Sequence, residues 1–510
     1  MKRSIFTRLI SFLLAVCLLL PAHAAPARAQ STLPVYLIIA PDEFEYALGP
    51  FVNLKTSQGF QVALALLSKT GSTKEQIKTY IQDYRPRPKY VLLAGDTSQI
   101  PSWPATAAIA GTQGPCPNST NQPRPCTDLY YATFDGSTDI LPDVILGRLP
   151  VQDDLQLGAL INKFIGFEQA PPDAPWRKKI SFVANDNVDY YAVSEGAHND
   201  AIDGWTDQYF YGTFDRTGAS TLGGDRLYPH QDSCQAEEQD LLASINDGRL
   251  MVIYHGPGSS TAWQWRTGED FNTADVAALS GPPVPLVLAL ADNTADFAAE
   301  VSMADAWLLH ETAGALAYIG TSFELYADRN DDLENIFFGE LFAHPGSPPS
   351  IGEALKNTLI KFKTVYSVSV TTQYLEAYQI LGDPSLKIIP PSGGHLESPA
   401  INYYGHLGET IVLPFSLTNT RPVTTKFSLA ISDSPYFTTA LELLVVELIP
   451  LEKREMSAYI RSLEGTDPGV QQFFDITASI DTVVSTLTVS VQVLDPPLNY
   501  VYLPFIGDSP

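Results

Sequence analysis

Leu250-Met251-Val252-Ile253-Tyr254-His255-Gly256-Pro257-Gly258-Ser259 is a short apolar run that ends abruptly in small and polar residues. Leu286-Val287-Leu288-Ala289-Leu290-Ala291-Asp292-Asn293-Thr294-Ala295-Asp296-Phe297 has the same pattern. Such runs are typical of buried parallel strands that present functional residues at their carboxyl ends. The two stretches therefore predict strands of a parallel sheet, with any functional side chains located where the strands end.

Apolar runs alternate with helical segments from residue 33 to residue 390. Predicted strands cover 35–40, 61–67, 90–96, 143–148, 179–184 and 315–320, with a terminal turn and strand at 381–386. Predicted helices cover 44–57, 73–83, 155–168, 303–312 and 353–366. This alternation predicts an α/β fold with mainly parallel sheets. A break at 171–175 divides the region into two similar α/β subdomains, 33–170 and 176–390, and the second carries both quoted strand ends.

The composition changes at Pro390-Pro391-Ser392-Gly393-Gly394, which we interpret as a linker. Beyond the linker, apolar and polar residues alternate in 410–417, 426–431 and 486–493. This pattern predicts an immunoglobulin-like antiparallel β-sandwich over 391–510. The apolar tail Tyr500–Ile506 is interpreted either as a last strand or as a surface-sorting element.

The N-terminal sequence pattern predicts that the protein is exported from the cell. In residues 1–29, basic residues precede the apolar run Leu9–Leu20, and Ala27-Arg28-Ala29 offers a small-x-small cleavage site, as in a secretory signal peptide. The run is shorter than the about 20 apolar residues that a membrane span needs. We therefore expect a secreted, extracellular protein, free or attached to the cell surface, with no transmembrane span after signal removal. A net charge of -26 disfavours nucleic acid as a partner.

Three of the four cysteines lie beyond the predicted signal peptide. Cys116 and Cys126 flank a loop rich in Pro, Asn and Gln, and in an oxidising compartment we expect them to form a disulfide. In the chain-entropy model such a bond stabilises the protein by about 2–3 kcal/mol. Cys234 is left over. No base signature adjoins it, so a partly buried structural thiol is favoured over a nucleophile.

Several segments together resemble gingipain-type cysteine peptidases, which have a caspase-like α/β fold. They are Val91–Asp96 with Ile100-Pro101, Thr127–Tyr131 with Asp135-Gly136, Pro142–Arg148, Gly248–Leu250 leading into Tyr254 and Gly258-Ser259, Ala304–Trp307, and Leu381–Leu386. No single segment is specific, but their order and spacing are. The resemblance covers the chain up to about residue 390.

That family uses a thiolate and an imidazole at the ends of neighbouring strands, with backbone N–H groups stabilising the oxyanion. The His strand of the family reads Tyr-x-Gly-His-Gly-Ser. Gapless matching of Tyr254, Gly256, Gly258 and Ser259 places Pro257 at the His position. Proline has no side-chain proton to transfer.

The other strand of the family reads Cys-x-x-Gly-x-Phe. Matching Phe297 places Asp292 at the Cys position, and a carboxylate is a poor nucleophile for peptides at neutral pH. The resemblance thus implies a degenerate dyad. His255 is a candidate substitute, because a strand that ends in His-Gly also occurs in the wider caspase-like class. That substitution needs a two-residue shift, and we favour a structural or surface role for His255 over a His255–Asp292 dyad.

The sequence predicts no cofactor with certainty, but calcium stays open. Asp292, Asp296 and Glu300 would share one face if their segment were helical and could then bind calcium, but we favour a solvated acidic loop.

Three functional hypotheses remain open. The first is a secreted pseudo-peptidase that binds a peptide or protein ligand in a cleft at Gly256, Gly258 and Ser259. The second is an active secreted cysteine endopeptidase with a displaced dyad. The third is an extracellular binding or scaffold protein.

Overall fold

The computed structural model describes residues 33–109, 111–136, 138–171, 174–205, 223–325, 329–342, 348–389, 393–419, 424–449, 452–480 and 483–494. The predicted signal peptide and the apolar tail lie outside these residues. Among the described helices, none is long and apolar enough to cross a membrane.

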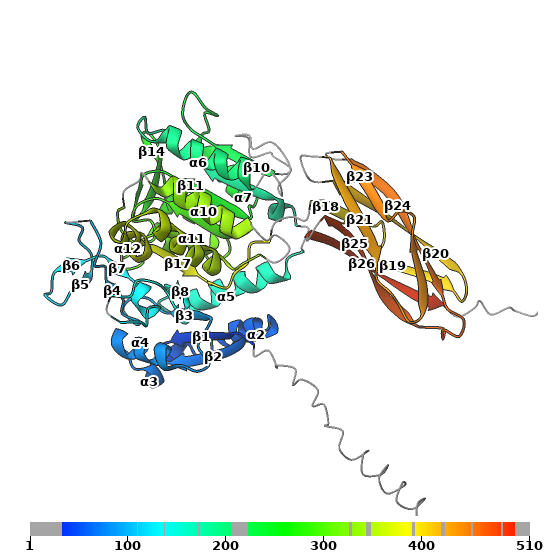
Figure 1. The fold of residues 1–510 in the computed structure, drawn as a ribbon, viewed down its shortest axis with the longest axis horizontal. Coiled ribbons are helices and arrows are strands. Elements are labelled where there is room, and N and C mark those ends of the chain that lie inside the picture. The colour runs from blue at the N-terminus through cyan, green and yellow to red at the C-terminus, as the bar shows by residue number, and fades with distance from the viewer. Residues whose placement is uncertain are drawn as a thin grey trace, which may run out of the picture. The chain divides into compact units, whose positions relative to one another are not determined.

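One sheet of ten strands forms the α/β domain, and its strands run from β2 at one end of the domain to β10 at the other (Figure 1). In sheet order they are β10 (Gly223–Leu227), β9 (Lys179–Val183), β11 (Met251–His255), β15 (Val284–Leu290), β16 (Ala315–Thr321), β17 (Tyr378–Gly382), β8 (Ile145–Leu149), β3 (Tyr90–Ala94), β1 (Val35–Ala40) and β2 (Gln61–Leu66). Within this sheet only the β16–β17 pair is antiparallel. The predicted mainly parallel α/β fold is therefore confirmed.

The two sequence halves share this sheet and do not form separate sheets. Strand β17 comes last in the domain, yet it lies between β16 of the second half and β8 of the first half. Its contact with β8 is narrow, because the pairing comprises a single residue pair, Leu381 with Arg148. This position marks a seam between the two halves.

Helices connect the strands. They are α2 (Gly49–Ser57), α3 (Leu67–Thr70), α4 (Lys74–Asp83), α5 (Asp154–Gln169), α6 (Tyr191–Gly204), α7 (Glu238–Asn246), α8 (Thr273–Ala277), α9 (Met303–Leu309), α10 (Asn330–Phe342), α11 (Ile351–Val365) and α12 (Val368–Ala377). Helix α4 begins as expected, since Thr73 caps it in a capping box with Gln76. Helix α2 begins later than expected, at Gly49, because a 3-10 turn at Asp42–Phe44 precedes it.

The central strands are buried on both faces. Every residue of β1, β3, β11, β15 and β16 is buried, which explains why these strands read as continuous apolar runs rather than alternating ones.

A buried ion pair holds the loops at the carboxyl ends of β3 and β8. The guanidinium of Arg148 donates to both carboxylate oxygens of Asp128, from Nε at 2.6 Å and from Nη2 at 3.0 Å. It also donates to the carbonyl oxygens of Gly95, at 2.7 Å, and of Ile100, at 3.0 Å. Three of the segments that resemble gingipain-type peptidases therefore come together at the Arg148 side chain.

A second buried carboxylate joins the end of the domain to its beginning. Asp383 forms an ion pair with Lys55 of α2 and accepts a hydrogen bond of 2.8 Å from Tyr36 of β1. It also accepts bonds from the backbone and hydroxyl of Ser385. This network gives a physical role to the segment Gly382-Asp383-Pro384-Ser385, because Asp383 is the shared acceptor and Ser385 is one of its donors.

The C-terminal region is a β-sandwich, as predicted. Its strands are β18 (Gly394–Glu397), β19 (Asn402–His406), β20 (Thr410–Asn419), β21 (Thr425–Ile431), β22 (Phe437–Leu441), β23 (Val445–Leu448), β24 (Lys453–Ser462), β25 (Gln471–Ile480) and β26 (Val483–Leu494). They form one sheet ordered β18-β20-β24-β22 and another ordered β19-β26-β25-β21-β23. Leu413, Phe427 and Phe474 are among the core residues that these sheets contribute.

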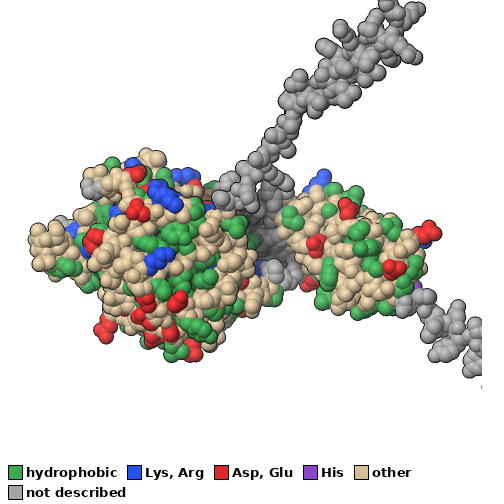
Figure 2. Space-filling model, turned by 90° about the horizontal axis from the view of Figure 1, so that it is seen from below, with side chains coloured by type: hydrophobic (Ala, Val, Ile, Leu, Met, Phe, Trp, Pro, Cys, Tyr) green, Lys and Arg blue, Asp and Glu red, His purple; other side chains and the backbone are tan. Residues whose placement is uncertain are grey.

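The described surface carries its charge unevenly. On the face in Figure 2, acidic side chains gather along the lower rim of the α/β domain, whereas Lys and Arg lie in small separate groups.

We expect Asp128→Asn to destabilise the α/β domain by about 3–5 kcal/mol, because it leaves the Arg148 guanidinium buried without its counter-ion. Urea unfolding followed by tryptophan fluorescence measures this loss. Asp189→Asn, at an exposed position, is the matched control and should change stability little. Equal stability of the two variants would contradict the role assigned to the ion pair.

Candidate functional site

The two quoted strand ends lie side by side. Strands β11 and β15 are parallel neighbours, with His255 in register with Leu290. The loops that follow meet closely, because a Cβ atom at Gly258 would lie only 2.8 Å from the carbonyl oxygen of Asp292. Only glycine permits this approach. The structure therefore brings the loop of Pro257 against the loop of Asp292.

The backbone at Pro257 is held firmly. Its carbonyl oxygen accepts hydrogen bonds from the Tyr254 hydroxyl, at 2.7 Å, and from the backbone N–H of Gln264, at 3.0 Å. The Tyr254 ring stacks on Trp263 with 4.8 Å between ring centroids. Because the backbone is fixed in this way, Pro257 is an ordered part of the site and not a loose loop residue.

Residues 258–272 then form a small antiparallel sheet ordered β12 (Gly258–Ser259), β13 (Ala262–Arg266) and β14 (Glu269–Asn272). Gly256, Gly258 and Ser259 are all partly exposed. Strand β12 is at the edge of this sheet, so the candidate site includes one strand that pairs on a single side.

Asp292 is a partly buried carboxylate at the end of β15. Its Oδ1 accepts a hydrogen bond of 2.9 Å from the backbone N–H of Leu325. Burial raises the pKa of Asp292 to about 6 and outweighs the lowering effect of that bond, while nearby Glu324 adds to the rise. No Lys or Arg of the described chain forms an ion pair with Asp292.

His255 does not face Asp292. Successive side chains of a strand point to opposite faces, and Tyr254 contacts the Trp263 side. The His255 side chain, only 5% exposed, lies instead against α10, with Nδ1 3.1 Å from Oε2 of Glu334. Among the described contacts of His255 and Asp292, none joins the two residues.

A buried His–Glu–His cluster occupies that helix face. Glu334 is fully buried and its Oε1 lies 2.6 Å from Nδ1 of His198, on α6. Nε2 of His198 lies 3.1 Å from the carbonyl oxygen of Val183. The His198 ring therefore bridges the Glu334 carboxylate and the backbone of β9.

The charge of Glu334 is strongly favoured in this cluster. Burial raises the pKa of Glu334, but His198 and His255 outweigh it and lower that pKa to about 2. The sequence analysis missed this cluster. Helices α6 and α10 were not predicted, and Glu334 is 136 residues from His198 along the chain.

The expected calcium geometry at Asp292, Asp296 and Glu300 is wrong. Residues 291–301 form turns and not a helix, so the three side chains do not share a helix face. Asp296 instead uses its Oδ1 to accept a hydrogen bond of 3.3 Å from the backbone N–H of Ala298. Local hydrogen bonding of this kind lets an Asp side chain stabilise a turn at the expense of a helix.

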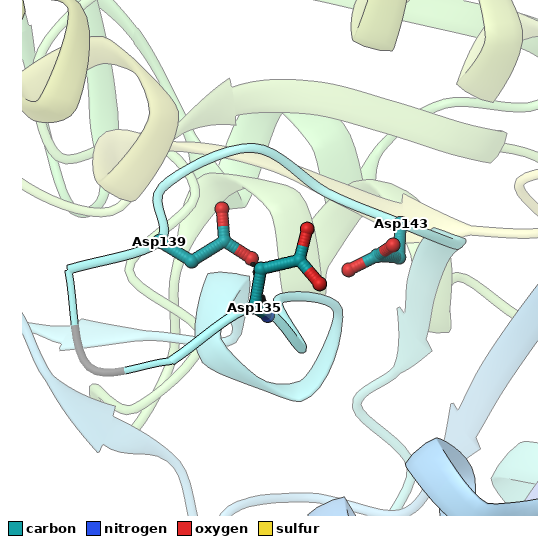
Figure 3. A group of neighbouring side chains, drawn as sticks. All are labelled: Asp135, Asp139 and Asp143. Atoms are coloured by element: carbon teal, nitrogen blue, oxygen red, sulfur yellow. Dashed lines mark hydrogen bonds between the residues drawn. The ribbon is translucent and has the colours of Figure 1, made fainter.

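Within the described chain, three other carboxylates gather in the way that a metal site requires. Asp135, Asp139 and Asp143 have oxygens within 4.8 Å of one another, and Figure 3 shows them in one loop ahead of β8. Two of the three carboxylates already have partners, however. Asp139 accepts from the backbone N–H groups of Phe134 and Asp135, and Asp143 pairs with Arg87 at 2.7 Å. These contacts account for the positions of Asp139 and Asp143 in the cluster.

None of the cysteines in the described chain is on β11, β15 or the loops that directly follow them. Cys116 and Cys126 are joined by a disulfide that closes the hairpin of β5 (Cys116–Pro117) and β6 (Pro123–Arg124). Cys234 is partly buried in a segment that follows β10. Since β9 separates β10 from β11, strand spacing alone puts β10 about 10 Å from β11.

We expect Asp292→Asn to stabilise the protein at pH 7.5 by about 1–3 kcal/mol and to have little effect near pH 4. The folded state raises the pKa of Asp292, so it binds the proton more tightly than the unfolded state, and the wild type loses stability as the pH rises from about 4 through 6. Urea unfolding at the two pH values measures the difference. A variant less stable than wild type at pH 7.5 would show that the Asp292 charge is favourable.

Glu334→Gln should have the opposite effect, destabilising the domain at pH 7 by about 3–5 kcal/mol because it removes the buried carboxylate that both His198 and His255 contact. The folded state lowers the pKa of Glu334, so its contribution is present above about pH 4.5 and is lost as the pH falls toward 2. The pH dependence of urea unfolding should therefore be flatter below pH 4.5 in the variant. Parallel curves for wild type and variant would contradict this.

Comparisons with known proteins agree with this geometry. Residues 29–389 match the model of peptidase family C25. The crystal structure of the Arg-specific cysteine proteinase gingipain R matches with a TM-score of 0.56 and 17% identity, over 91% of this chain and 99% of that one. The complex of Porphyromonas gingivalis RgpB pro- and mature domains matches with a TM-score of 0.55 and 17% identity, over 90% and 100%. No curated protein matches the chain. The family match covers most of the sequence, and the chain therefore belongs to peptidase family C25, the gingipain family.

Proposed function

We propose that this protein is a secreted, catalytically degenerate member of its family, which binds extended polypeptide at the carboxyl edge of β11 and β15 without cleaving it. One observation carries the proposal. Pro257 and Asp292 follow two adjacent parallel strands whose loops meet, and motif matching assigns these two positions to the imidazole and the thiolate of the family pattern.

Neither residue can replace the group that the chemistry needs. Peptide cleavage of this type requires a polarisable nucleophile and a group that transfers a proton to the leaving amine. Pro257 has no titratable side chain. Asp292 is a carboxylate without an adjacent base among its described contacts, and a carboxylate is a poor nucleophile for peptides.

The alternative of a displaced dyad has less support. The His255 imidazole is committed to Glu334 between the sheet and α10, on the face opposite to Tyr254. Cys234 follows β10, which is separated from β11 by a whole strand. A catalytic pair of these residues would need both side chains to leave their present surroundings.

Peptide binding is supported by the exposed backbone of the site. Strand β12 pairs with β13 through Gly258 and Ser259 on one side only, and within the described sheet its other side has no neighbouring strand. An extended peptide can add to such an edge through main-chain hydrogen bonds. The likeness to an Arg-specific proteinase concerns the fold, so we leave the side-chain preference of this site open.

The test is incubation of the purified chain with a quenched fluorogenic peptide library at neutral pH, with reductant and calcium. We expect no cleavage by wild type or by Cys234→Ala, and measurable cleavage by the double variant Pro257→His/Asp292→Cys. Wild-type cleavage that Cys234→Ala abolishes would overturn the proposal and establish a displaced nucleophile. Cooperative thermal unfolding of each sample serves as the folding control.

A further inference from the structure

A partly open cavity of about 70 Å³ lies at the seam between β8 and β17. It exists where the two strands pair through only one residue pair, so side chains and not backbone hydrogen bonds fill the space between them. Helices α11 and α12 contribute part of its wall. The cavity is separate from the site described above, because β16 and β17 lie between β15 and β8 in the sheet.

The cavity wall is mainly apolar. Ala132, Ile145, Leu355, Leu359, Leu375 and Ile380 are among the lining residues, and all of them are buried. An apolar cavity of this kind excludes water and accepts small apolar groups. Its volume is roughly half of the 150 Å³ that holds benzene in an engineered cavity, so it suits an alkyl chain of about three carbons.

Most polar groups in the wall already have partners. Asp128 and Arg148 pair with each other. The Tyr378 hydroxyl donates to Asn330, at 3.0 Å, and the Gln379 amide donates to the carbonyl oxygen of Glu376, at 2.7 Å. None of these groups is available to bind a charged ligand.

Lys356 of α11 is different. It lines the cavity and is partly buried, yet it forms no ion pair within 4.0 Å with any carboxylate of the described chain. The carboxylate whose charge it feels, Asp143, is already paired with Arg87. Burial lowers the pKa of Lys356, as expected for an ammonium that has lost water without gaining a full counter-ion.

We propose that this seam cavity binds a short-chain monocarboxylate, with the alkyl chain in the apolar cavity and the carboxylate on the Lys356 ammonium. The apolar lining selects the chain, the volume limits its length to about four carbons in total, and the single cation without an ion pair selects an anionic head group. The ligand is recognised independently of the strand-end site, so this proposal does not rest on the proposed function.

Isothermal titration of the full chain with butyrate, 1-butanol and octanoate tests the proposal. We expect butyrate to bind in the millimolar range, 1-butanol to bind about fivefold more weakly because it lacks the charge, and octanoate not to bind because it is too long. Lys356→Met should make butyrate bind no better than 1-butanol. Lys363→Met, an exposed position on the same helix, is the matched control and should behave as wild type.

Two further variants test whether butyrate binds in this cavity. Ala132→Val should abolish butyrate binding by filling the cavity, and Leu375→Ala should enlarge it and shift the preference to hexanoate. No butyrate binding by wild type at 50 mM (about tenfold above the expected range), equal binding of butyrate and 1-butanol, or unchanged binding in Lys356→Met would each overturn the proposal. If Ala132→Val does not fold, the chain-length shift in Leu375→Ala decides the question.

Discussion

The buried side chain of Arg148 connects several separate segments of the α/β domain, and the arrangement of the sheet and of the candidate site depends on these contacts. Its guanidinium pairs with Asp128, holds the carbonyl groups after β3, and lies over the Phe297 ring with 5.2 Å to the ring centroid. Its backbone supplies the one residue pair between β8 and β17. A single buried cation thus ties the seam of the sheet to the loop that carries Asp292. A guanidinium suits this task because its five donors have a fixed planar geometry that several acceptors can share.

The two carboxylates nearest the strand ends show how environment decides the role of one chemical group. Glu334 is fully buried but faces two imidazoles, so its charge is stabilised and the cluster ties α6 and α10 to β11. Asp292 is less buried but has one backbone donor and no cationic partner among the described residues, so its charge is disfavoured.

Particular elements show where sequence reasoning succeeded. The strands at 35–40, 90–94 and 251–255 were predicted because burial on both faces leaves an unbroken apolar run. Helix α4 was predicted from its cap and first turn. Helix α6 was missed because its sequence is rich in small and polar residues, and Ala197, His198 and Ala201 are buried only by tertiary packing. For the acidic run after β15 the favoured loop is what the structure has, because local hydrogen bonds such as that of Asp296 with Ala298 stabilise turns there.

The sequence by itself determined the two-part architecture, the family, and the residues Pro257 and Asp292 at the matched positions, since these follow from local hydrophobic patterns and motif spacing. Tertiary structure alone decided that one sheet unites both halves, that His255 faces Glu334 and not Asp292, and that a cavity opens at the seam beside Lys356. These features depend on contacts between residues far apart in the chain, such as His255 with Glu334 and Arg148 with Leu381. No local pattern encodes such contacts, because they arise only when separate strands and helices pack together.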